Sequence, residues 1–126
     1  MSITLNNSIY TLLVSSTGLT AIVGTKIFPV LIPPETLLPA IVIERDFSTE
    51  YHRDGAGINE SNVEIAILSQ SYNQSVQIAV LVDGILNNYK GTVSNNRIVD
   101  THLVSADEGY QEDAFLQKLI YVMKNY

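Results

Sequence analysis

The sequence predicts an α+β fold: a single domain over residues 1–126, with an antiparallel sheet of about four strands. One long helix is expected on one face of the sheet, and a short helix at the N-terminus. Three observations predict it. The 126 residues are 46% hydrophobic, enough for one folded domain with its own core. Two apolar strand-like runs lie close together in the sequence, at residues 40–43 and 62–68. A long amphipathic segment, residues 72–90, follows them.

The N-terminal third is expected to be mainly helical. Apolar residues recur at helical spacing at Leu5, Ile9, Leu12 and Leu13, with Ser2 or Asn7 as the N-cap. The polar stretch 15–18 should end this helix, and residues 19–23 predict one further turn. Residues 26–29 predict a short edge strand, because Pro29 has no N–H to donate to a central ladder.

The central strands are joined by a long connection. In the second strand Val63, Ile65 and Ile67 alternate with more polar or smaller residues, which predicts one buried face. The connection, residues 46–60, is too long for a tight hairpin turn. Connections of this length in compact domains are usually functional or disordered.

The segment 72–90 predicts the main helix, with Asn73 as its N-cap and Gly91 as its C-terminal stop. Gly84 lies inside it and costs about 1 kcal/mol relative to alanine, which indicates close packing against the sheet. Further apolar residues widen the helix surface beyond one stripe. This excess predicts either deep burial or a second contact surface against another subunit, formed by Val76, Val80 and Leu81.

The last third returns to β-structure. Residues 98–104 predict a strand and residues 107–109 a turn. The final segment, residues 115–124, fits a helix through Phe115, Leu119 and Val122. A hairpin strand is preferred because of the turn before it and its branched residues.

Composition excludes several classes of function. Thirteen acidic residues against seven basic ones give a net charge of −6, without the clustered cations that neutralise phosphates. Sequence-specific nucleic-acid binding is therefore not expected. The chain has no cysteine, so thiol catalysis and cysteine-ligated zinc are excluded. No apolar stretch reaches the roughly 20 residues that a membrane-spanning helix needs, so no membrane association is expected.

Two groups of residues are candidates for a catalytic or metal-binding site. His52, Arg53 and Asp54 are adjacent in the long connection, but catalytic groups are defined by converging geometry rather than by adjacency. Asp100 and His102 share one face of a predicted strand, yet a metal site needs a third and usually a fourth ligand. A solvated loop and an ordinary polar sheet face are preferred. No catalytic, metal or cofactor site is predicted.

Tyrosine is the dominant aromatic residue, with seven of the ten aromatics. Tyrosine is favoured at protein interfaces because it buries a large area and keeps a polar group. Tyr51 and Tyr110 are the candidates for such contacts, whereas Tyr72 and Tyr89 are expected in the core.

The order of these features resembles the tail completion proteins of long-tailed bacteriophages, also called tail terminator or head-to-tail joining proteins. The matching features cover nearly the whole chain. They are the N-terminal helix, the segments 24–29, 38–42, 54–55 and 63–68, the helix closing at 89–91, residues 97–98, the turn containing 107–108, and a final strand.

The resemblance implies a structural virion protein without enzymatic activity or cofactor. Such a protein forms a homo-oligomeric ring, hexameric by family resemblance, at the head-proximal end of the tail tube. It would end tube growth and contact the tail tube protein and the head connector protein, after assembly in the host cytoplasm. DNA would pass through the lumen, which the acidic charge suits.

The long connection is the element expected to contact a partner or a neighbouring subunit, through Glu50, Tyr51, His52, Arg53 and Asp54. The alternatives are another neck or tail component, such as an adaptor or the tube protein, or a small metal-dependent enzyme. Adaptors tend to be mainly helical, whereas this chain predicts mixed structure.

Overall fold

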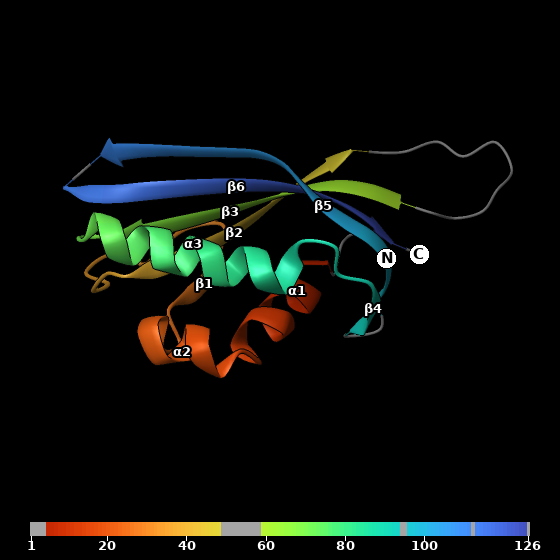
Figure 1. The fold of residues 1–126 in the computed structure, drawn as a ribbon, viewed down its shortest axis with the longest axis horizontal. Helices are drawn as coiled ribbons and strands as arrows, with labels where there is room; N and C mark the ends of the chain where they lie inside the picture. Colours follow the sequence, from red (N-terminus) through yellow and green to blue (C-terminus); the bar gives the residue numbers. More distant parts are fainter. Residues whose placement is uncertain (1–4, 49–58, 94–95, 112, 126) are drawn as a thin grey trace, which may run out of the picture.

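The computed structural model describes residues 5–48, 59–93, 96–111 and 113–125. Within them three helices lie on one side of a sheet of six strands (Figure 1). In chain order the elements are α1 (Leu5–Val14), α2 (Thr17–Val23), β1 (Ile27–Pro29), β2 (Ala40–Ser48), β3 (Asn59–Ser69), α3 (Tyr72–Leu86), β4 (Gly91–Val93), β5 (Asn96–Gln111) and β6 (Ala114–Asn125).

The sheet has the strand order β1-β2-β3-β6-β5-β4. β1 pairs with β2 in parallel, and every other described pair is antiparallel. The long strands β3, β5 and β6 form its centre. The edge strands β1 and β4 each pair with their neighbour over only three residues. Two register shifts interrupt the β5–β6 ladder, between Ile98 and Asp100 and between Leu103 and Ser105.

One core lies between the helices and the inner face of the sheet. Alternate residues of β2, β3 and β6 point into it and meet one stripe of each helix. The buried core consists of Leu5, Ile9, Leu13, Leu19, Val23, Ile27, Ile41, Ile43, Val63, Ile65, Ile67, Ile78, Val82, Leu86, Ile98, Leu119, Tyr121 and Met123.

Serine caps begin two of the helices. The Oγ of Ser16 accepts from the backbone N–H of Leu19 at 3.3 Å, so α2 begins at Thr17. The Oγ of Ser71 accepts from the N–H of Gln74 at 3.4 Å and begins α3, two residues before the predicted cap Asn73. α3 ends at Leu86, earlier than predicted, and Asn88 follows with φ +66°.

The predicted sheet of about four antiparallel strands with one long helix on it is wrong. The sheet has six strands and is mixed, and three helices cover it. β1 lies within the segment 26–29 that predicted a short edge strand, and it is at one edge of the sheet. β4 has three residues, too few to show the alternation that reveals a strand in a sequence. The predicted extra turn at 19–23 is a separate helix, α2, which packs against both α1 and α3.

The predicted turn at residues 107–109 is also wrong, because these residues lie inside β5. Asp107 is opposite Lys118 in β6, and Glu108 is opposite Gln117. Opposite charges and hydrogen bonds between facing residues favour pairing and outweigh the turn preference of Asp and Gly. The chain reverses later, next to Asp113, which has φ +62°. The final segment is the hairpin strand β6 and not a helix.

The position of Gly84 inside the helix predicted close packing against the sheet, and this prediction is wrong. Gly84 is exposed, and a Cβ built on it would have no atom within 4 Å outside its own turn of helix.

Tyr121, in the middle of β6, joins the sheet to α3 by a hydrogen bond. It is fully buried, and its hydroxyl donates to Oδ1 of Asp83 at 2.8 Å. Burial, this hydrogen bond and the negative charge of Asp83 raise the pKa of Tyr121 above the usual value of about 10.

Replacing Tyr121 with phenylalanine is expected to lower the free energy of unfolding by about 1–2 kcal/mol at pH 7, because Asp83 loses a donor. The raised pKa contributes stability that is fully present below pH 10 and is lost as the pH rises above it. The wild type should lose up to about 1.4 kcal/mol per pH unit there, and Tyr121→Phe should lose less. Urea denaturation from pH 7 to 11 measures both effects. Tyr10→Phe, at a half-exposed position, is the control and should change little.

Replacing Gly84 with alanine is expected to raise the free energy of unfolding by about 0.5–1 kcal/mol, since the new methyl group meets no neighbour and the helix interior gains propensity. The matched control is Gly24→Ala at the end of α2. Gly24 has φ +61°, a region that L-residues rarely adopt, so this variant should lose about 1 kcal/mol or more. Thermal and urea denaturation compare the two. A destabilising Gly84→Ala would contradict the exposed placement.

Candidate interaction surfaces

The structure describes only some of the predicted contact residues. Glu50, Tyr51, His52, Arg53 and Asp54 lie outside the described residues, between the end of β2 and the start of β3. Their role as a contact loop stays a prediction.

The predicted apolar surface of α3 divides into three environments. Val80 is 65% exposed, and Val76 is half-buried. Leu81 packs on the core from the side of α2, where a methyl group placed on Gly18 would lie 3.9 Å from its Cδ2. The three side chains therefore do not form one continuous exposed patch, and Val80 is the member that is available to a partner.

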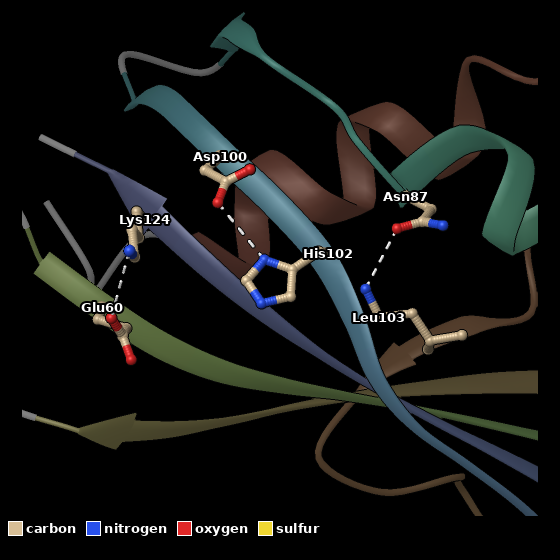
Figure 2. A network of polar contacts seen from close by, with 6 residues as sticks. All are labelled: Glu60, Asn87, Asp100, His102, Leu103 and Lys124. Carbon is tan, nitrogen blue, oxygen red and sulfur yellow. Dashed lines mark hydrogen bonds and ion pairs between the residues drawn. The ribbon is translucent and has the colours of Figure 1, made fainter.

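The polar pair Asp100 and His102 does come together. Nδ1 of His102 lies 3.4 Å from Oδ2 of Asp100 on β5, and both side chains are well exposed (Figure 2). In the part of the chain that the structure describes, no group of three or more His, Cys, Asp or Glu side chains is placed to hold a metal ion. The pair supplies at most two ligands, and a catalytic metal site needs three from the protein.

The sheet face opposite the helices carries these residues and a set of cross-strand ion pairs. Lys118 lies 3.5 Å from Glu64, and Lys124 lies 4.0 Å from Glu60 (Figure 2). Both pairs join β6 to β3. Because the side chains are 31–43% exposed, each pair contributes little stability. The pairs do leave both lysines partly neutralised by glutamates of the same subunit.

An aromatic and acidic site lies where the β5–β6 hairpin passes the N-terminus of α3. The ring of Phe115 packs edge-on against Tyr110, with centroids 4.9 Å apart, and against Tyr72, with centroids 5.8 Å apart. Tyr110 is 61% exposed and Tyr72 is 45% exposed. With Glu108 and Gly109 they line a shallow groove of about 310 Å³. We call Tyr72, Glu108, Tyr110 and Phe115 the hairpin-tip site.

Glu108 is oriented in this groove by two donors. Nε2 of Gln117 and the hydroxyl of Tyr72 each donate to its Oε2 at 2.9 Å. The hydrogen bond from Gln117, and to a smaller extent that from Tyr72, lowers the pKa of Glu108. Glu108 is therefore ionised at neutral pH. The same contact with Glu108 raises the pKa of Tyr72. The result is a fixed carboxylate beside exposed aromatic rings.

The opposite end of α3 is basic. Lys90 and Thr92 are exposed on the loop and strand that follow the helix, and Arg97 is opposite Thr92 across the β4–β5 pair. These three residues line a shallow groove of about 430 Å³ together with Gly91, Ile98 and Val99. We call Lys90, Thr92 and Arg97 the basic end.

Several hydrogen bonds hold the basic end in place. Oδ1 of Asn87 accepts from the N–H of Leu103 at 3.2 Å (Figure 2). The N–H of Asn88 donates to the carbonyl of Thr101 at 2.7 Å. The Oγ of Ser8 in α1 donates to the carbonyl of Val93 at 2.9 Å and accepts from Nδ2 of buried Asn96 at 2.8 Å. α1, α3 and β5 thus fix the short β4–β5 hairpin.

A third exposed surface is the apolar loop between β1 and β2. Val30, Leu31 and Leu37 are 61–80% exposed. Val30 has φ +71°, an unfavourable conformation for a β-branched residue. Its N–H donates to the carbonyl of Ile43 at 3.0 Å, which holds the loop against β2.

The sequence indicated only part of these surfaces. Tyr110 is exposed, as an interface candidate should be, and Tyr89 packs on the core. Tyr72 was expected in the core but is 45% exposed. Glu108 was missed because residues 107–109 were expected to form a turn. The basic end was missed because Lys90 and Arg97 lie on different strands and loops, and only the β4–β5 pairing brings them together.

None of the helices in the described residues is long and apolar enough to cross a membrane.

Two of the three comparisons with known proteins find a match. A family model described as Tail completion protein gp17 matches residues 7–122. The fold is similar to that of a chain solved in the virion of a native gene transfer agent (GTA) particle. That match has a TM-score of 0.83 and 20% identity, and covers 96% of this chain and 93% of the other. None of the curated proteins matches this chain.

Proposed function

Because the chain belongs to the tail completion protein gp17 family, we propose that this phage tail structural protein forms a ring at the head-proximal end of the tail tube. In this role it ends tube growth and joins the tail to the head connector. Its partners are further copies of itself, in a ring that is hexameric by family resemblance, the tail tube protein and the head connector protein. DNA passes through the lumen, and assembly takes place in the host cytoplasm.

One observation carries the proposal: the family match spans residues 7–122, which is nearly the whole chain. The likeness to a chain of a gene transfer agent virion supports the fold of such a component. The placement of polar and aromatic sites at opposite ends of α3 supports a protein that contacts more than one neighbour (Figure 1).

The ring is tested by adding the purified protein to tail tubes that lack it and imaging the product by electron microscopy. We expect a ring at one end of each tube, and tubes that no longer elongate when more tube protein is added. A matched variant replaces His102 with alanine and should assemble as the wild type does, since no step of the proposed role uses this imidazole. Binding along the sides of tubes would instead indicate a tube protein, and binding to the head connector alone an adaptor.

We propose further that the segment joining β2 to β3 is a contact arm, with Glu50, Tyr51, His52, Arg53 and Asp54 as its contacting residues. A variant lacking residues 51–57 should fold with a melting temperature close to that of the wild type, because β2 and β3 keep their full pairing. It should fail to cap tubes or to bind the connector in the same imaging assay. Normal assembly of the deletion variant would rule out the arm and leave the ring in place.

A further inference from the structure

The hairpin-tip site has the chemistry of a receptor for a cation. Exposed aromatic faces attract ammonium and guanidinium groups, and a carboxylate beside them adds a charge-assisted hydrogen bond. The carboxylate of Glu108 lines the groove and is held in place by Gln117 and Tyr72, which both donate to one oxygen, Oε2. No lysine or arginine lines this groove among the residues that the structure describes.

The basic end has the complementary chemistry. Lys90 is exposed, and Arg97 adds a second positive charge to the same groove. Other lysines of the described chain are already engaged: Lys118 and Lys124 face glutamates, and Nζ of Lys26 donates to the carbonyl of Leu37 at 2.9 Å. The basic end is therefore a local positive surface on a chain whose net charge is −6.

The two sites lie at opposite ends of α3. Tyr72 begins α3, and Lys90 follows its C-terminal end. Figure 1 shows the turn of the β5–β6 hairpin beside the start of α3, and β4 beyond the other end of the helix. A surface at one end that is complementary to a surface at the other end cannot be satisfied within one subunit.

We propose that the hairpin-tip site of one copy binds the basic end of the next copy. Lys90 is placed to lie against the rings of Tyr110 and Phe115, with Glu108 accepting a hydrogen bond from its ammonium group. This contact deepens the proposed ring function and rests on it. Such a head-to-tail contact uses two different patches, so each subunit binds two neighbours, and the series closes when the rotation between copies permits.

The test uses two variants that each lack one side of the contact. The tip variant carries Glu108→Gln and Tyr110→Ala, so it gains no positive charge, and the base variant carries Lys90→Glu and Thr92→Glu. Alone, each should associate about tenfold or more weakly than the wild type. Mixed in equal amounts they retain one intact contact between them, so native mass spectrometry should find a one-to-one heterodimer and no larger species.

A third variant exchanges the charges within one chain, with Glu108→Lys and Lys90→Glu, and should regain part of the wild-type assembly. Glu35→Lys, an exposed charge reversal in the β1–β2 loop, is the control and should assemble as the wild type does. Melting temperatures identify any variant that fails to fold. If the tip variant does not fold, Tyr110→Ala alone, at an exposed position, replaces it in the test of the hairpin-tip site.

Two outcomes separate the contact from the ring. If the wild type forms rings and the tip and base variants form them equally well, the contact is wrong and the ring stands. If the wild type forms no ring, alone or on tail tubes, the ring and the contact both fail. Large oligomers in the mixture of tip and base variants would also overturn the contact.

Discussion

The hydrogen bond from buried Tyr121 to half-buried Asp83 joins α3 to the centre of the sheet and favours one position of the helix on it. Tyr121 is the largest fully buried side chain and stands in β6, between β3 and β5. A phenol hydroxyl buried without a partner is costly, so the helix is favoured in the one position that brings Asp83 over it. Ile78, Val82 and Leu86 then pack on the same face of the sheet. Every surface at the ends of α3 depends on this position.

The two ends of α3 are each joined to β5 by polar contacts. At the start, the hydroxyl of Tyr72 donates to Glu108, and at the end Asn87 and Asn88 bind the backbone of Leu103 and Thr101. β5 has 16 residues, long enough to run beside the whole helix. Because the same strand carries Glu108, Tyr110 and Arg97, the spacing between the hairpin-tip site and the basic end is set by a helix and a strand that are fixed to each other. Sites on such elements keep their geometry better than sites on loops.

Much of the fold could be predicted from the sequence, because long elements carry long patterns. The alternation of Val63, Ile65 and Ile67 predicted the centre of β3, and the apolar stripe from residue 78 predicted α3. The mixed sheet could not be predicted, since β1 and β4 are three-residue strands whose pairing depends on tertiary contacts. Glu108 was hidden by a local signal: Asp107 and Gly109 favour a turn, but pairing with β6 overrides that preference. The basic end requires the β4–β5 register, which no local pattern encodes.

The charge of the chain bears on when such a contact forms. Copies with a net charge of −6 repel one another on average, yet this repulsion is screened over about 8 Å at physiological ionic strength. A contact between Glu108 and the basic end acts at hydrogen-bond distance, within that range. In the proposed ring a tail tube would hold several copies side by side, which raises the effective concentration of each copy for its neighbour and strengthens this contact. If the proposed ring forms, opposite charges at the two ends of an acidic subunit favour assembly on the tube over assembly in solution.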